Sequence, residues 1–158
     1  MLKPSLCCIS INLSNAGHKF QSMTRKKYLL TEQTSALNMI IEKTINNLKV
    51  IKETILYCHR NGWNYRIGSD VIPLATLPEF MSFDGLNQVF DDCRVNLLCD
   101  EISNTIKTTG IRCSMHPDQF VVPASANPNT VINSIHMLEY HAIIMNHFGV
   151  YLSHIKHQ

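Results

Sequence analysis

The sequence predicts an α/β fold in the order β-α-β-α-β-α-β, a partial TIM barrel with about half the strands of a (β/α)8 barrel. Short apolar segments alternate with long segments of helical periodicity, which is typical of parallel strands joined by crossover helices. No Gly-x-Gly-x-x-Gly or phosphate-binding loop follows a predicted strand, so a nucleotide-binding doubly wound sheet lacks its usual signature. The chain has 158 residues, whereas a complete barrel needs roughly 250 residues and eight strands, twice the number of strands predicted here.

The composition is that of a folded protein, and we expect residues 1–158 to form a single, incomplete barrel domain. Hydrophobic residues make up 45% and charged residues 16% of the chain, which favours a core over disorder. The formal net charge of +2 neither indicates nor excludes a nucleic-acid partner. No apolar run approaches the roughly 20 residues that cross a bilayer, and no secretory signal is present, so we expect a cytoplasmic or nuclear-type location without membrane partners.

The first half of the chain contains two predicted strands and one long helix. Residues 5–11 are a short apolar run that predicts a buried strand, and a polar connection follows over 12–30. A helix is expected over 31–61, because apolar residues recur there at alternating spacings of three and four and Thr31 can cap its start. A second strand over 63–67 ends at Gly68, and the proline-rich stretch after it is unsuited to a helix interior.

The second half repeats this alternation. A helix over 86–108 is expected with Leu97 among its buried residues, and a strand over 111–115 comes next. A helix over 128–148 follows, with Asn127 as its cap, and a fourth strand is expected over 150–155. The residues expected to form the buried stripe of that last helix are Val131, Ile135, Leu138, Ala142 and Met145.

The six cysteines form no C-x-x-C pair. This spacing argues against a structural zinc site, and the absence of an export signal favours buried thiols over disulfides. The side chains of the neighbouring residues Cys7 and Cys8 should point to opposite faces of their strand.

Polar residues follow the predicted strands where sites form in parallel α/β folds. His116 leaves the third strand, and its imidazole suits a divalent metal such as Mn or Zn; the alternative is a histidine bonded to backbone carbonyls. Gln119 and Phe120 could hold an unstacked base, or could form a loop with one packed aromatic. His154 lies near the end of the fourth strand, whereas His141 is expected to be a packing residue.

Several blocks of the sequence resemble the UV-damage endonuclease family. The two most specific blocks are 65–76 (YRIGSDVIPLAT) and 112–122 (RCSMHPDQFVV), and their combination carries the resemblance. Shorter matches at 47–48, 133–135 and 138–141 agree in order and spacing. The resemblance implies a TIM barrel related to endonuclease IV that nicks damaged double-stranded DNA immediately 5′ to UV photoproducts.

The resemblance also implies the cofactor and the site residues. Members of the family use divalent metal ions, commonly manganese, held by His, Asp and Glu at the carboxyl end of the barrel strands. By position, His116 and His154 match metal ligands, whereas Gln119 and Phe120 match a pair that probes the lesion. Asn12 stands at a candidate position for a further lesion contact in the first strand loop.

Two departures from the family pattern bear on activity. Leu77 occupies the position of the first metal-binding histidine, and the ligands of the second barrel half have no counterpart in the sequence. We therefore expect activity to depend on a separately encoded C-terminal half. The alternatives are a non-catalytic truncated fragment with weak or no DNA binding and a sugar-isomerase-like metal barrel, against which the Gln119–Phe120 pair argues.

Overall fold

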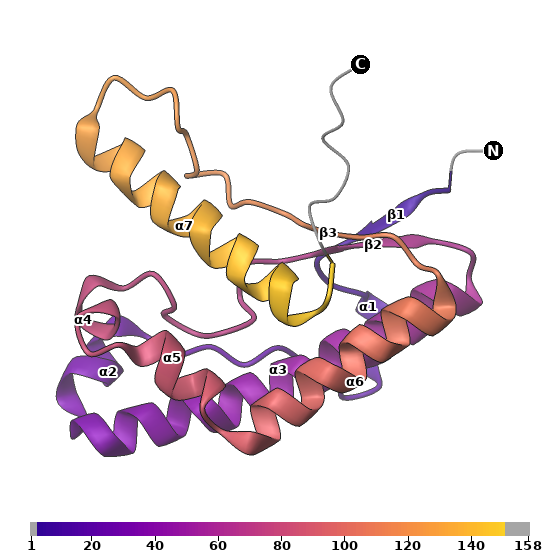
Figure 1. The fold of residues 1–158 in the computed structure, drawn as a ribbon, viewed down its shortest axis with the longest axis horizontal. Helices are drawn as coiled ribbons and strands as arrows, with labels where there is room; N and C mark the ends of the chain where they lie inside the picture. The colour runs from indigo at the N-terminus through magenta and orange to yellow at the C-terminus, as the bar shows by residue number, and fades with distance from the viewer. Residues whose placement is uncertain (1–2, 151–158) are drawn as a thin grey trace.

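A computed structural model describes residues 3–150 and contains a three-stranded parallel sheet (Figure 1). The strands are β1 (Ser5–Cys7), β2 (Asn64–Ile67) and β3 (Cys113–Met115), in the order β1-β2-β3. Tyr65 pairs with Leu6 on one side and with Cys113 on the other. The predicted parallel α/β arrangement is confirmed for these strands. Residues 151–158, which include His154 and most of the predicted fourth strand, lie outside the described residues.

Helix α3 (Gln33–Arg60) is the long helix that the sequence predicted, but a different residue caps it. The carboxylate of Glu32 accepts hydrogen bonds from the backbone N–H groups of Thr34 and Ser35 at 2.9 and 2.8 Å. The prediction of Thr31 as the cap is wrong, because its hydroxyl donates to Lys27 O at the end of the preceding helix. A longer carboxylate replaces a short hydroxyl in satisfying the free N–H groups of the first turn.

The segment between β1 and α3 is not the plain connection that was predicted. It contains α1 (Ile11–Asn15) and α2 (Arg25–Leu30), which are capped by Ser10 and Thr24. The strand expected over 5–11 ends at Cys7, since Cys8 has a φ of +57° and Ser10 already accepts a bond from the first turn of α1. The apolar run predicted a longer strand, but the cap formed by the Ser10 side chain starts a helix within it.

The helix expected over 86–108 consists of two helices, α5 (Gly85–Phe90) and α6 (Cys93–Thr109), after the short helix α4 (Pro78–Met81). The break falls where Asp92 adopts an extended backbone and its side chain caps α6. This change shifts the buried face of α6, and Leu97 is 60% exposed instead of buried. Gly110 ends α6 in the left-handed conformation.

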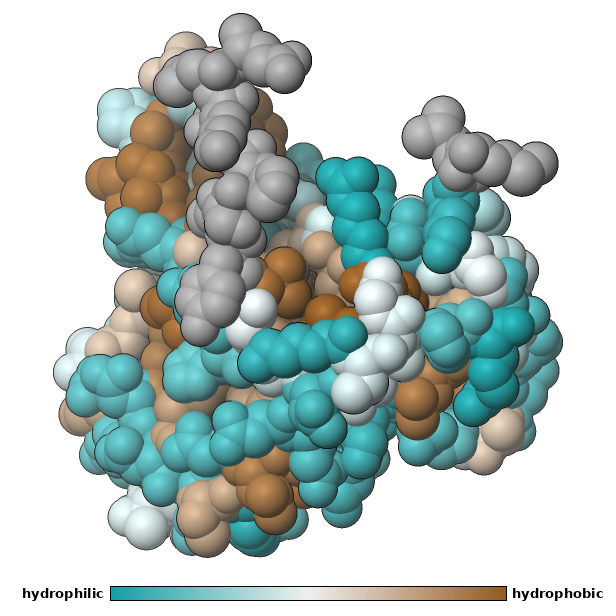
Figure 2. All heavy atoms as spheres, turned by 45° about the vertical axis from the view of Figure 1, so that its right-hand side comes forward, coloured by the Kyte–Doolittle hydropathy of each residue, from teal (hydrophilic) through white to brown (hydrophobic). Residues whose placement is uncertain are grey.

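Helix α7 (Pro128–His147) begins at the predicted cap, since the side chain of Asn127 accepts from Asn129 N at 2.9 Å. Its predicted stripe is wrong: Ile135 and Leu138 are exposed and the other three members are half-buried. The buried residues are Ser134, Tyr140, His141 and Ile144. Figure 2 is turned about the vertical axis from Figure 1, so each element keeps its height. Hydrophobic side chains lie on the surface at its upper left, at the height of the start of α7 in Figure 1. The polar residues Ser134, Tyr140 and His141 face inward because each finds a hydrogen-bond partner there.

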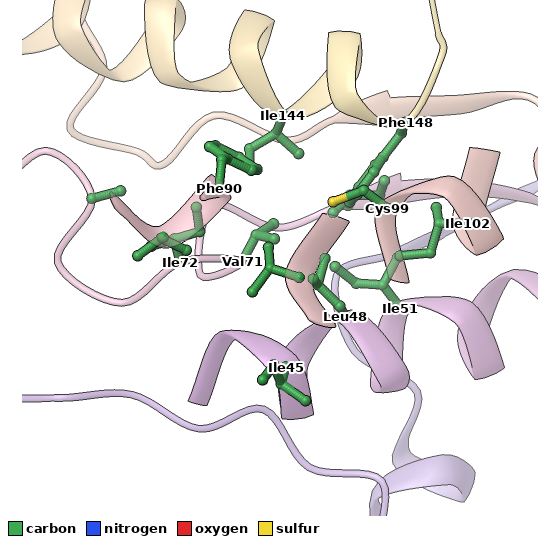
Figure 3. Packing of buried hydrophobic residues seen from close by; sticks show 14 of the residues in the cluster. Ile45, Leu48, Ile51, Val71, Ile72, Phe90, Cys99, Ile102, Ile144 and Phe148 are labelled. Atoms are coloured by element: carbon green, nitrogen blue, oxygen red, sulfur yellow. The ribbon is translucent and has the colours of Figure 1, made fainter. Parts of the chain in front are cut away.

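The hydrophobic core lies between the sheet and the long helices. α3 contacts β2 and α6, and α7 contacts α6 and β3, so the long helices follow one another along the sheet. Figure 3 shows side chains from α3, α6, α7 and the loop after β2 converging on one another. Those labelled include Leu48, Ile51, Val71, Ile102 and Phe148, each at most 1% exposed. Among residues 3–150, no helix is long and apolar enough to cross a membrane.

The cap at Glu32 predicts a pH-dependent stability. Its two backbone N–H bonds hold the pKa of this carboxyl at about 2, below its ordinary value of 4.5. A depressed pKa in the folded state contributes stability that is complete above the unfolded-state value and disappears as the pH falls through the folded-state value. We expect Glu32→Gln to be less stable than the parent chain near neutral pH and equally stable near pH 2, as measured by urea unfolding at a series of pH values. A stability difference that does not change with pH would contradict the assignment.

Candidate functional site

The carboxyl ends of the three strands form one edge of the sheet, and backbone hydrogen bonds extend the pairing beyond the strands. Cys8 N donates to Arg66 O at 2.8 Å after β1, and His116 N donates to Ile67 O at 2.7 Å after β3. Both segments are therefore fixed to β2 at the point where polar residues begin. This edge is where parallel α/β proteins place their sites.

Asn47 of α3 holds the loop that follows β2. Its side-chain amide donates to Asp70 O at 3.0 Å, to Val71 O at 3.2 Å and to Gln21 O at 2.9 Å. Its carbonyl oxygen accepts from Gln21 N at 2.7 Å. The Asn47 residue is fully buried, so one side chain ties two separate loops to the helix beneath the sheet edge.

Helix α7 holds the same loop from the other side. The hydroxyl of Tyr140 accepts from Ile72 N at 2.9 Å and donates to Ser69 O at 3.1 Å. Ser69 Oγ donates to His116 O at 3.2 Å and lies 3.0 Å from His141 Nε2, so Nε2–H of His141 donates to that oxygen. Burial lowers the pKa of His141. The prediction of His141 as a packing residue agrees with this buried, hydrogen-bonded ring.

The loop after β3 carries three of the residues predicted for the site. His116 is half-buried, and its Nδ1 lies 2.8 Å from Pro117 O. Gln119 is exposed, and Phe120 is exposed by 77% although it is a large apolar residue. The structure therefore places a fixed imidazole and a solvent-facing amide–aromatic pair within one short loop.

An open hollow of about 410 Å³ lies between this loop, the loop after β2 and α7. Its lining includes Leu77, Asp118, Phe120, Asn133 and Met137. Leu77 contributes an apolar, half-buried side chain where the resemblance expects a metal-binding histidine. The hollow therefore has one carboxylate but no imidazole among its lining residues.

Cys7, Cys8 and His116 form a cluster that was not predicted from the sequence. The ligand atoms of these residues all lie within 4.8 Å of one another, and the two sulfur atoms are 3.6 Å apart. The expectation that the two cysteines point to opposite faces is wrong, because the positive φ of Cys8 breaks the strand alternation. Burial, and next the Cys7 thiol, raise the pKa of Cys8 to about 11. The spacing of the residues in the sequence does not predict this turn.

The cysteines divide by position. Cys58, Cys99 and Cys113 are buried, in agreement with the prediction of buried thiols. Cys7 and Cys93 are exposed and Cys8 is half-buried, which contradicts it. The exposed thiols stand at the end of β1 and the start of α6, where the core does not cover them.

Carboxylates also lie near the sheet edge. Partial burial, and next the charge of Asp118, raise the pKa of Asp70. The donors grouped with His116 are nevertheless two sulfur atoms, and manganese prefers oxygen and nitrogen ligands. Among the described residues, the ligand set around His116 therefore does not fit manganese.

Asn12 lies apart from the other predicted site residues. It is exposed on α1, and its Nδ2 donates to the hydroxyl of Tyr57 on α3 at 3.1 Å. In the described part of the chain, no hydrogen bond joins it to His116, Gln119 or Phe120. The structure thus brings His116, Gln119 and Phe120 into one loop without Asn12.

The comparisons with known proteins agree on one family. The family model described as UV-endonuclease UvdE matches residues 3–156. A UV DNA damage endonuclease of Nostoc sp. is 29% identical over 133 residues, covering 84% of this chain and 39% of the relative. A putative UV-damage endonuclease of Acanthamoeba polyphaga mimivirus is 29% identical over 150 residues, covering 94% of this chain and 43% of the relative.

The fold comparison agrees. A solved structure described as "Crystal Structure of SacUVDE" superposes with a TM-score of 0.73 at 24% identity, covering 95% of this chain and 47% of the other. At this identity, the likeness shows a shared fold. The chain spans less than half of the length of the curated relatives it matches, with 39% and 43% of the two named above.

Proposed function

The chain belongs to the UV-endonuclease UvdE family, and from that premise we propose that it acts in DNA repair as an endonuclease that incises damaged double-stranded DNA 5′ to UV photoproducts. The observation that carries the proposal is the loop after β3. It combines the fixed ring of His116 with the exposed side chains of Gln119 and Phe120 beside an open hollow. An exposed aromatic at such a place is suited to contact with an unstacked base.

In this proposal, Gln119 and Phe120 detect the lesion. Phe120 offers a ring face to a base that has lost its stacking neighbour, and the Gln119 amide offers both a donor and an acceptor to base edges. Tyr140 and His141 act indirectly, since they hold Ser69, which in turn binds His116 O at the base of the same loop. Asn12 is proposed as a further DNA contact, on the separate surface of α1.

The proposed reaction is metal-dependent. The family resemblance implies manganese with His116 and His154 as ligands, but the two sulfur atoms grouped with His116 do not suit that ion. The chain's described contribution is the orientation of His116 by the Pro117 carbonyl and by its backbone bond to β2.

We further propose that residues 1–158 form a single domain equivalent to half of a TIM barrel. Three adjacent parallel strands, with the long helices in sequence along them, support this arrangement. The coverage of 47% of the related solved structure is in keeping with it. Dependence of incision on a separately encoded C-terminal half stays a prediction.

The proposed lesion contact predicts a selective loss of binding. We expect Phe120→Ala to weaken binding to UV-irradiated duplex DNA about tenfold, because one base–aromatic stack contributes roughly 1–3 kcal/mol. Binding to the intact duplex should not change. Fluorescence anisotropy with irradiated and intact oligonucleotides measures both affinities.

Phe83→Ala is the matched control, because Phe83 is another exposed phenylalanine, located between α4 and α5. An equal loss in both variants, or on both DNAs, would show that Phe120 does not read the lesion. Nicking of irradiated supercoiled DNA in manganese, by the chain alone and together with a separately expressed C-terminal half, tests incision itself, and His116→Ala should abolish it. Preferential binding without incision would favour the alternative that this chain is non-catalytic.

A further inference from the structure

We propose that Cys7, Cys8 and His116 form a zinc site at the carboxyl edge of the sheet, with two sulfur ligands and one imidazole ligand. The three ligand atoms lie within 4.8 Å of one another. Cys7 is exposed and the other two residues are half-buried, so an ion can reach the cluster from solvent. This inference concerns the ion that binds and does not depend on incision of DNA.

A tight turn brings the two sulfur atoms together. Ile9 N donates to Cys7 O at 2.7 Å, and Cys8 between them has a φ of +57°, which forms a three-residue γ-turn. In an extended strand, these neighbouring side chains would lie on opposite faces. The turn instead leaves their sulfur atoms 3.6 Å apart. Tyr65 fixes the turn further, since its buried hydroxyl donates to Cys8 O at 2.9 Å.

The residue that follows β2 leaves room for the cluster. Cys8 comes after β1 and His116 after β3, so their side chains must meet over the end of the strand between them. Gly68 occupies that place, and a Cβ added to it would lie 3.5 Å from both Cβ and Sγ of Cys8. A longer side chain at position 68 would therefore press against the Cys8 side chain.

The hydrogen bonding of His116 leaves one ring nitrogen available to a metal. Nδ1 of His116 lies 2.8 Å from Pro117 O, and a carbonyl oxygen can only accept a hydrogen bond. Nδ1 therefore carries the hydrogen, and Nε2 of the neutral ring keeps its lone pair. A backbone carbonyl bonded to the second ring nitrogen is the usual support of a metal-binding histidine.

The spacing of the ligands suits zinc. Zn–S bonds of about 2.3 Å in a tetrahedral site place two sulfur ligands about 3.8 Å apart, and the two sulfur atoms here are 3.6 Å apart. When the ion binds, each thiol releases its proton to the solvent, and three protein ligands leave one tetrahedral position for water. Thiolates select zinc or cadmium over manganese, which prefers carboxylate and water oxygens.

Titration with cadmium tests the site without DNA. In the fully reduced chain, we expect one equivalent of Cd²⁺ to produce the ultraviolet thiolate-to-cadmium absorption, and Zn²⁺ to displace the ion and remove this absorption. Cys7→Ser, Cys8→Ser and His116→Ala should each weaken the affinity about a hundredfold or more, since even partners outside the ligand set cost ten- to a hundredfold. Cys93→Ser is the matched control, because Cys93 is also exposed but stands at the start of α6.

A second readout keeps the test independent of the folding of any variant. In the parent chain, zinc should shift the ring nitrogen resonances of His116 in ¹H–¹⁵N NMR spectra, and a large excess of Mn²⁺ should not displace Cd²⁺. An unshifted His116 ring, an unchanged cadmium affinity in the Cys7→Ser and Cys8→Ser variants, or an equal loss in Cys93→Ser would overturn the proposal. DNA incision in manganese is measured separately, so either proposal can fail while the other stands.

Discussion

Asn47→Ala is expected to lower the free energy of unfolding by about 3 kcal/mol, because buried groups that lose their partners each cost roughly 1–3 kcal/mol. The substitution leaves Gln21 N without its acceptor and removes the donor from the backbone oxygens of Gln21, Asp70 and Val71. Asn47 is fully buried, and its bond to Val71 O is buried as well, so water replaces these bonds poorly. Urea unfolding followed by circular dichroism measures the loss.

Asn46→Ala provides the control on the neighbouring residue. The Asn46 side chain donates to one backbone oxygen, Lys19 O, at an exposed position, and to the side chain of Asn47. Its removal should cost about 1 kcal/mol. If the two alanine variants unfold at the same urea concentration, Asn47 does not hold the two loops in the way its contacts indicate.

Much of the fold could be predicted from the sequence because its signals are local. The periodicity of 31–61 predicted α3, and Asn127 before Pro128 predicted the start of α7. The errors occurred where a side chain competes with the helix or strand pattern. Asp92 interrupts a periodic run by capping α6, and Ser10 starts α1 inside an apolar run.

The buried face of α7 could not be predicted from hydrophobicity. Tyr140 and His141 are buried because the loop after β2 offers them hydrogen-bond partners, whereas Ile135 and Leu138 remain exposed. Helical periodicity identifies which residues share a face, but it does not identify which face meets the rest of the protein.

The candidate site could also be predicted only in part. The sequence placed His116, Gln119 and Phe120 in one loop after a strand, and the structure has them there. The approach of Cys8 to His116 depends on a positive φ at a non-glycine residue and on the pairing of both segments with β2, which lies between them in the sheet. Neither is encoded in local spacing.

Tyr140→Phe is expected to lower the free energy of unfolding by about 2 kcal/mol, since it removes one hydroxyl that takes part in two buried hydrogen bonds. Burial raises the pKa of Tyr140 and keeps the hydroxyl protonated, so it can donate to Ser69 O while accepting from Ile72 N. The phenylalanine ring fills the same space, and the change therefore isolates the hydrogen bonds from the packing.

Tyr57→Phe is the matched control, because the Tyr57 hydroxyl accepts a single exposed bond from Asn12; its loss should cost less than about 1 kcal/mol. Amide hydrogen exchange locates the effect of Tyr140→Phe. The Ile72 amide loses its acceptor and should exchange faster. The His116 amide, which donates to Ile67 O in the sheet pairing, should keep its protection. An unchanged exchange rate at Ile72 would mean that another acceptor replaces the tyrosine. Helix α7 would then hold the loop after β2 through His141 and Ser69 alone.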